Sequence, residues 1–383
     1  MDNSLAKGGK KARNSSFELL RIVAMFAILL HHLVVHNVDA VEALPGAWSR
    51  LLAYTFAYPI GRVGVAIFIA MTAWFYAEKR GSLVASIRKV WHINKQATFY
   101  SLLFGAFFLI RGNVQADTQT IVSMVLPIIG NTWWFVSTFS VFILILPFII
   151  QGLEALGQKN HRTLCILLTV LYGVVPFIPY VSVMSESANL LSEFFVIVVM
   201  VTYIRWNVDI EVLRGARAWF VASIVISLLV LVFCYVLSQK QYPLISSLSS
   251  SFYSAVFSHP SSILSLTIAI PSLLLAASTR VWTSKPINVI ASFAFGTYLI
   301  TDYALMRPLI WSGPLSLSHL GTFSPSFLAC CVAAMCIFLV ACAIDAIRAI
   351  LFSLTVDRHP AKYLNMVIDK CIVGKKYKCL KCI

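Results

Sequence analysis

Residues 17–35 of this 383-residue chain read FELLRIVAMFAILLHHLVV. A helix over this stretch is about 28 Å long, close to the thickness of the hydrocarbon core of a bilayer. Four basic residues precede it, as in a secretory signal peptide. A cleaved signal would not carry Arg21, His31 and His32 in its apolar part. We therefore predict an uncleaved first transmembrane helix over residues 17–37.

The apolar character continues along the whole chain. Hydrophobic residues make up 59% of the sequence and charged residues only 12%, whereas soluble domains are about a quarter charged. Long continuous apolar stretches favour helices over barrel strands, which would alternate apolar and polar residues. The sequence therefore predicts an all-α fold, a polytopic transmembrane bundle of about ten helices. After the first helix, the predicted spans are 60–78, 97–112, 132–152, 163–181, 188–205, 218–238, 261–279, 287–309 and 326–354.

Three other features refine this prediction. Segment 119–130 is apolar but contains Pro127 and Gly130, so we expect it to be re-entrant or interfacial. The Ser-rich stretch 238–260 is predicted to be an external loop. Most of the nine cysteines lie inside apolar spans, where Cys acts as a small hydrophobic residue. We expect reduced cysteines and no disulfide framework.

The net charge of +15 is also typical of nucleic-acid-binding proteins, but no basic soluble domain is present to bind nucleic acid. Basic residues in membrane proteins collect in cytoplasmic loops. With ten helices and a cytoplasmic N-terminus, 23 of the 30 Lys and Arg residues lie on the cytoplasmic side. We predict a multi-pass cell-membrane protein with both termini in the cytoplasm. It would consist of a tail over 1–16, a transmembrane domain over 17–354 and a basic tail over 355–383.

The first helix carries ionisable residues, which are costly in a membrane and usually face the bundle interior. Arg21 and His32 are eleven residues apart, almost three turns, so they share one face about 16 Å apart along the axis. Glu18 is placed to pair with Arg21, whereas His31 points about 100° away from His32. Arg21 could simply snorkel to the interface, and a single His could bond a neighbouring helix. Together they indicate a polar pathway, which suits a transporter or an enzyme.

The quoted stretch, with Arg21, ten residues and then His32, resembles the Arg-X10-His signature of the acyltransferase-3 family. It is most similar to the surface-polysaccharide acyltransferases of that family. Three further stretches resemble family segments in the expected order. They are SIRKVWHINKQATFYSLLF from Ser86, NTWWFVSTFSVFILILPFI from Asn131, and ASFAFGTYLITDYALMRPLIW from Ala291.

The chain departs from the family pattern at two places. The second helix carries Thr72 and Ala73 where the family usually has a Ser-Gly pair. Thr301 precedes Asp302 where the family often has a His. The missing His leaves one less candidate for proton relay, and it keeps open an altered substrate or a reduced activity.

The resemblance implies transfer of an acyl group, most commonly acetyl, from acyl-CoA to a hydroxyl of a cell-surface glycan or lipid-linked sugar. His32 would be the base or a covalent carrier of the acyl group, because imidazole titrates near neutrality. Arg21 would order the donor or the polar path to His32. Asp302 would orient His32, and Tyr298 would stabilise the oxyanion.

The same resemblance implies sites for the two substrates. Arg88, Lys89 and Lys95 are candidates for binding the CoA phosphates, although cytoplasmic loops are basic in any case. Trp133 and Trp134 are candidate substrate-binding hydrogen-bond donors, although aromatic residues also anchor helix ends at the interface. No cluster of metal ligands appears around His31, His32 and His36, so we predict no catalytic metal.

Two other function classes remain open at this stage. A secondary transporter also places charged residues within membrane helices, but the halves of this chain show no matching repeat. A non-catalytic relative of the enzyme family would fit the missing second His.

Overall fold

The computed structural model describes residues 13–42, 58–177, 190–209, 215–238, 259–312, 327–358 and 368. All regular structure within these ranges is helical. The chain is an integral, multi-pass membrane protein. Five described helices are long and apolar enough to cross a bilayer, namely Ser15–Val35, Pro59–Lys79, Trp134–Ala155, Ala216–Phe233 and Leu328–Leu354.

Each of the ten predicted spans overlaps a helix in the described residues, so the all-helical prediction is confirmed. The principal helices are α1 (Ser15–Val35), α4 (Tyr58–Lys79), α5 (Leu83–Ile110), α7 (Trp134–Ala155), α8 (Gly157–Thr169), α9 (Leu190–Asn207), α11 (Ala216–Ser238), α13 (Ile263–Ser278), α14 (Lys285–Thr301) and α17 (Phe327–Leu354). Short helices are α2 (Val38–Glu42), α6 (Thr118–Val125) and α15 (Arg307–Trp311).

Several predicted boundaries were wrong. Helix α5 begins at Leu83 rather than at 97, because the Ser82 side chain caps it by accepting a hydrogen bond from the Ala85 amide. The span predicted over 287–309 is interrupted after Thr301. Its helix, α14, ends there, and the separate α15 follows with Pro308 in its first turn, a position where proline is tolerated.

The end of the predicted span 163–181 is also irregular. After α8 the chain continues as a π-helical turn, Val170–Val174, and a 3-10 turn, Val175–Phe177. In segment 119–130 the helix α6 ends two residues before Pro127. The loop prediction for 238–260 and both tail predictions fall almost entirely outside the described residues.

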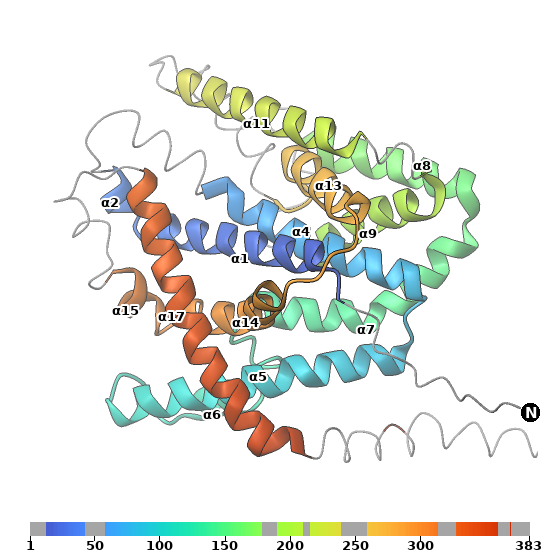
Figure 1. The fold of residues 1–383 in the computed structure, drawn as a ribbon. Coiled ribbons are helices and arrows are strands. Elements are labelled where there is room, and N and C mark those ends of the chain that lie inside the picture. Colours follow the sequence, from blue (N-terminus) through green and yellow to red (C-terminus); the bar gives the residue numbers. More distant parts are fainter. Residues whose placement is uncertain are drawn as a thin grey trace, which may run out of the picture.

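Helix α1 lies in the middle of the bundle (Figure 1) and packs against α4, α13, α14 and α17. Two glycines allow α4 to approach it closely. A Cβ added at Gly61 would lie 2.4 Å from Cβ of His31, and one at Gly64 would lie 2.6 Å from the carbonyl oxygen of Ala24. Small residues at such crossings are typical of membrane helix pairs. The contact at Gly61 also fixes the end of α1 that carries the histidines.

A buried polar cluster joins α5 to α17. Oδ1 of Asp345 accepts hydrogen bonds from the Tyr100 hydroxyl at 2.8 Å and from Nε of Arg348 at 2.6 Å, and Oδ2 accepts from Nη2 of Arg348 at 3.0 Å. A Cβ on Gly296 would overlap the Asp345 carboxyl group. The glycine therefore allows α14 to pack directly against this cluster.

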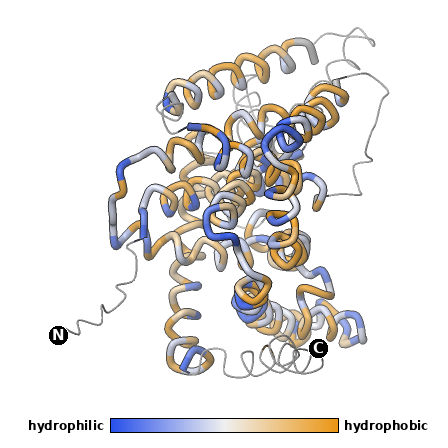
Figure 2. The backbone as a smooth tube through the Cα atoms, turned by 90° about the vertical axis from the view of Figure 1, so that its right-hand side faces the viewer, coloured by the Kyte–Doolittle hydropathy of each residue, from blue (hydrophilic) through white to orange (hydrophobic). Residues whose placement is uncertain are grey.

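Hydrophobic residues predominate along the helices, and hydrophilic residues lie mainly near helix ends and turns (Figure 2). Helix α11, at the edge of the bundle in Figure 1, exposes many large apolar side chains, among them Trp219, Val225, Leu229 and Phe233. In water this surface would be unfavourable, whereas lipid tails solvate it. The outer surface is thus consistent with a bilayer setting.

Candidate active site

A cavity of about 1240 Å³ follows α1 along its length. Its lining includes Arg13 and Arg21 near the start of the helix and His32 and His36 near its end. The fifteen residues from Arg21 to His36 correspond to about 22 Å along a helix axis. The cavity therefore connects two chemically different regions, which we call the basic end and the histidine end.

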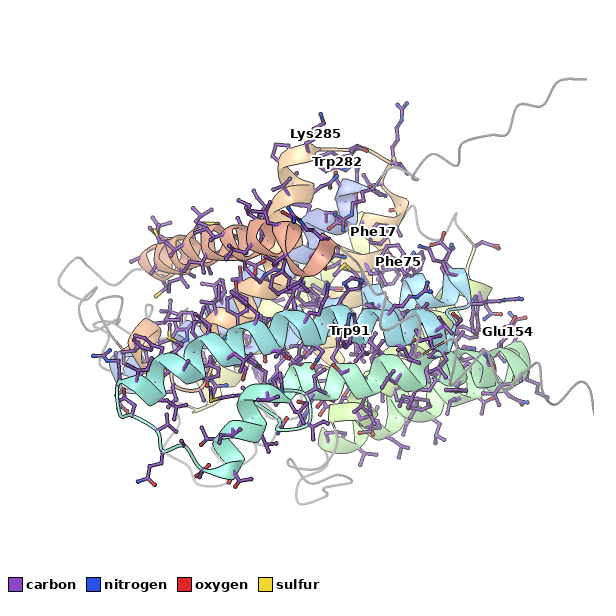
Figure 3. All side chains as sticks on the ribbon, turned by 90° about the horizontal axis from the view of Figure 1, so that it is seen from below. Phe17, Phe75, Trp91, Glu154, Trp282 and Lys285 are labelled. Carbon is purple, nitrogen blue, oxygen red and sulfur yellow. The ribbon has the colours of Figure 1, made fainter. Side chains whose placement is uncertain are left out.

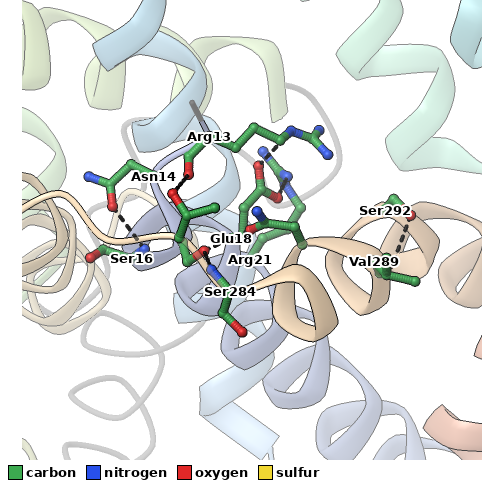
Figure 4. Close-up of polar contacts among 11 residues, drawn as sticks. Arg13, Asn14, Ser16, Glu18, Arg21, Ser284, Val289 and Ser292 are labelled. Carbon is green, nitrogen blue, oxygen red and sulfur yellow. Dashed lines mark hydrogen bonds and ion pairs between the residues drawn. The ribbon is translucent and has the colours of Figure 1, made fainter. Parts of the chain in front are cut away.

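The basic end contains Arg13, Arg21 and Lys89. Glu18, which is buried, forms ion pairs with both arginines, at 3.4 Å to Nε of Arg13 (Figure 4). The ammonium group of Lys89 lies over two aromatic rings, 5.3 Å from the centroid of Tyr76 and 5.6 Å from that of Phe139. Glu18 pairs with the two guanidinium groups, and the ammonium group of Lys89 adds a third positive charge, which leaves an excess of positive charge at this end.

The segment between α13 and α14 holds the start of α1 in place. The Ser15 amide donates to the Trp282 carbonyl oxygen at 2.9 Å, and Nε1 of Trp282 donates to Oγ of Ser16 at 2.8 Å. Phe17 packs on Phe75 of α4 with ring centroids 4.8 Å apart. Trp282, Phe17 and Phe75 are labelled near one another in the view from below (Figure 3). These contacts fix the position from which Glu18 and Arg21 project.

The histidine end is built around His32 of α1. Nε2 of His32 lies 3.7 Å from Oδ1 of Asp302, the residue that caps the end of α14. Nε and Nη2 of Arg307 each contact that carboxylate oxygen at 2.9 Å. The imidazole also lies beside the rings of Tyr298 and Trp311, with centroid separations of 6.4 and 6.2 Å. This arrangement brings together an imidazole, a carboxylate and a phenol from α1 and α14.

Several polar atoms at this end make no hydrogen bond of ordinary geometry within the described ranges. They are Nδ1 of His32, Oδ2 of Asp302 and the hydroxyl of Tyr298, all of them buried. Buried polar groups are normally paired, and unpaired ones are often found at functional sites. All three residues line the cavity, and the Tyr298 hydroxyl interacts with the neighbouring Asp302 carboxylate. A substrate in the cavity would therefore meet buried polar groups whose hydrogen bonding is incomplete.

A second histidine–carboxylate pair lines the same cavity. Nδ1 of His259 lies 2.9 Å from Oε1 of Glu193. Glu193 belongs to the first turn of α9, and His259 lies just before α13. The sequence alone showed Glu193 only as a charged residue within a predicted span, and His259 only as part of a Ser-rich loop.

The structure brings most of the sequence-predicted residues together. Arg21, His32, Tyr298, Asp302 and Lys89 all line the cavity, as does Trp134. The ion pair expected between Glu18 and Arg21 is present. The cavity is also lined by His31, although the helix rotation separates it from His32.

Three predicted residues are not among those that line the cavity. Lys95 instead pairs with Asp357 after α17. Trp133 is fully buried, and its ring packs 5.5 Å from that of Tyr303. Arg88 is also missing from the cavity lining. For these three, the structure offers no direct route to a substrate in the cavity.

The two departures from the family pattern differ in their placement. Thr72 lines the cavity. Thr301 is buried, and its hydroxyl donates to the Thr297 carbonyl oxygen of its own helix at 2.9 Å, without lining the cavity. Thr301 therefore does not contribute to the described cavity wall.

The sequence interpretation missed Arg307 and Trp311 as site residues, although both lie in the stretch quoted from Ala291. Arg307 binds Asp302. Trp311 is fully buried, packs beside His32 and stacks on His36 at 6.3 Å, while its Nε1 donates to the Thr301 carbonyl oxygen. Their position within the motif was a usable signal, because the same segment supplies Tyr298 and Asp302.

The acyltransferase-3 family, described as an acyltransferase domain, matches residues 14–343. The chain belongs to this family. No curated protein and no solved structure matches it. The acyltransferase-3 match covers both ends of the cavity, from Arg21 to Asp302, as well as Glu193 and His259. Membership identifies the protein as a membrane O-acyltransferase, which uses an acyl donor and an acceptor.

Proposed function

We propose that the protein transfers an acyl group, acetyl in the simplest case, from acyl-CoA to a hydroxyl of a cell-surface glycan or lipid-linked sugar. The observation that supports this most strongly is the single cavity that joins a cluster of cations to the His32–Asp302 contact. CoA carries phosphate groups at one end of a long arm and the thioester at the other, so it needs two such regions at a distance.

The basic end is the proposed site for the CoA phosphates. Guanidinium groups match phosphate oxygens with paired hydrogen bonds, and Lys supplies a point charge. Arg21 and Lys89 are the residues to which we assign this role. By the positive-inside rule the basic loops face the cytoplasm, where acyl-CoA is available, and the histidine end then approaches the outer side. In this proposal residues 17–354 form the catalytic domain between two cytoplasmic tails.

At the histidine end, His32 acts as general base on the acceptor hydroxyl. The hydroxyl oxygen attacks the thioester carbonyl carbon while its proton moves to the imidazole. The tetrahedral intermediate then expels CoA as its thiolate, which takes the proton from the imidazolium. Asp302 positions the imidazole and stabilises its protonated form, and Tyr298 donates to the oxyanion.

Trp134 lines the cavity beside Phe135, whose ring lies 5.8 Å from that of Tyr298, and we propose that Trp134 contacts the substrate. A covalent route, in which His32 first carries the acyl group, uses the same residues. Rapid mixing of enzyme and acyl-CoA without acceptor separates the two routes. An acyl-enzyme forms in stoichiometric amount only in the covalent route.

The test of the proposal is transfer by the purified protein in lipid nanodiscs. Acetyl-CoA and envelope oligosaccharides should yield free CoA, detected as thiol, together with oligosaccharides heavier by one acetyl group. The surface glycans of cells with and without the gene should differ by the mass of one acetyl group. A protein that moves a labelled solute into vesicles, with no thiol release, would instead be a transporter.

A further inference from the structure

The cavity contains a second ionisable pair that the proposed reaction does not use. Glu193 and His259 contact each other at 2.9 Å, and both line the cavity. They come from α9 and from the residues before α13, whereas His32 and Asp302 come from α1 and α14. We propose that Glu193 and His259 form a binding site for the hydroxyl groups of the acceptor sugar.

The hydrogen bonding of Glu193 is incomplete in a way that points to a ligand. Oε1 contacts His259, whereas Oε2 is buried and makes no hydrogen bond within the part of the chain that the structure describes. An acceptor oxygen buried without a donor destabilises a protein, so such atoms are generally satisfied by a partner. The partner must be a hydrogen-bond donor small enough to enter the cavity, and a hydroxyl group meets both conditions.

The chemistry of the pair fits a neutral, polyhydroxylated molecule. A carboxylate accepts hydrogen bonds and cannot donate, whereas an imidazole can do either through its second nitrogen. The contact with Glu193 uses Nδ1 of His259, so Nε2 is the atom that a ligand would meet. Neighbouring hydroxyls of a sugar can donate to Oε2 of Glu193 and bond Nε2 of His259 together. A monohydric alcohol can satisfy only one of these atoms.

A purely structural role is the competing explanation, because the pair joins two helix ends. The turn before α13 is already closed by the backbone, since the Ser262 amide donates to the His259 carbonyl oxygen at 3.0 Å. The charge of Glu193 in the first turn of α9 is favourable in itself. Neither contact requires the two side chains to face the cavity, so a binding role accounts for more of the arrangement.

This inference rests on the proposed function for its context, but it is tested separately. Glu193→Gln keeps the size of the side chain and removes its charge, and His259→Gln removes the imidazole. Glu154→Gln is the matched control, because Glu154 also pairs with a basic residue, Arg80, but lies outside the cavity lining. Melting temperatures of all variants in nanodiscs would establish that they fold.

Transfer is measured against the concentration of a neutral disaccharide and of ethanol as a monohydric acceptor. Each site variant should raise KM for the disaccharide about 10- to 100-fold, the loss of one or two bonds to a charged or buried group. KM for acetyl-CoA should change less than about twofold. KM for ethanol should rise less than KM for the disaccharide, because ethanol can bond only one of the two atoms, and the control should match the wild type. An unchanged disaccharide KM in folded variants would overturn the inference.

Direct binding of the disaccharide, measured by titration calorimetry, separates this inference from the proposed function. Wild-type protein that binds the sugar more tightly than the site variants, yet releases no thiol, would support the binding site and contradict acyl transfer. If the wild-type protein transfers acyl groups but binds the sugar no more tightly than the variants do, the proposed function is supported and the sugar-binding site is contradicted. If Glu193→Gln fails to fold, His259→Gln and Glu193→Asp provide the same comparison.

Discussion

Nε2 of His32 and Oδ1 of Asp302 lie 3.7 Å apart, although they come from the first helix and from the end of α14. The distance is too long for a hydrogen bond, and Arg307 holds the carboxylate in place at 2.9 Å. A small movement of the imidazole on substrate binding would close the gap. The Asp302 carboxylate can therefore orient His32 and keep its ion pair with Arg307.

Replacement of His32 is the most direct test of the catalytic assignment. His32→Ala should lower kcat about 10²- to 10⁴-fold, the usual loss when a general base is removed. His31→Ala should be mild, because Ala retains the Cβ that packs against Gly61. Asp302→Asn should lower kcat with both KM values unchanged, and Asp302→Glu should restore part of it. A null His31→Ala with an active His32→Ala would reverse our assignment.

The structure separates the three basic residues of α5. Lys89→Ala should raise KM for acetyl-CoA about tenfold or more, since a phosphate contact in the ground state is lost. Lys95→Ala is the matched control and should leave this KM unchanged, because Lys95 pairs with Asp357 outside the cavity lining. Steady-state kinetics over acetyl-CoA concentration decides. Equal effects of the two substitutions would mean that only the general positive charge of the region matters.

The guanidinium of Arg21 provides a second test at the basic end. Arg21→Lys should still raise KM for acetyl-CoA, because an ammonium group cannot form paired bonds to phosphate. An arginine that merely snorkels to the interface would tolerate Lys. The melting temperature should be monitored as well, since the substitution alters the ion pair between Arg21 and Glu18.

Close helix packing predicts opposite effects for two glycines. Gly61→Ala should lower both the melting temperature and activity, because the added Cβ would lie 2.4 Å from the side chain of His31 and push α4 away from α1. Gly152→Ala in α7 meets nothing within 4 Å, so it should be neutral or stabilising by up to about 1 kcal/mol. Thermal unfolding in nanodiscs measures both. A Gly61→Ala protein with unchanged stability would contradict the close α1–α4 contact.

The proposed orientation can be tested without any activity assay. Reporter fusions after residue 383 and within stretch 238–260 should report opposite compartments, with the C-terminus in the cytoplasm, because that arrangement places 23 of 30 basic residues inside. Reporters in the same compartment would exclude ten crossings in the order we propose. The result would also show which end of the cavity faces acyl-CoA.

The sequence could predict that Arg21 and His32 face the same cavity, because both belong to one helix whose rotation per residue is known. The same rule could have separated the basic residues of α5. Lys89, His92, Ile93 and Gln96 have helical spacing and line the cavity together. Lys95 follows Lys89 by six residues, which turns it about 120° away.

Contacts between helices distant in sequence could not be obtained in this way. Glu193 and His259 meet because α9 and the start of α13 are both placed by the packing of the bundle, and no local pattern encodes their distance. Pro308 was a local signal for the break of the predicted span after Thr301. No local signal predicted the contact between Arg307 and Asp302 that results from this break. The turn that follows allows Arg307 to reach back to Asp302.

One rigid helix, α1, carries both the cation of the basic end and the imidazole of the histidine end. Their axial separation of about 16 Å is therefore set by the geometry of a helix and not by the packing of flexible loops. In the proposed reaction this spacing sets the length that the donor must have. A thioester on a short stem could occupy either end but could not bridge them, so the length of the arm would select the donor before any contact with the acyl group.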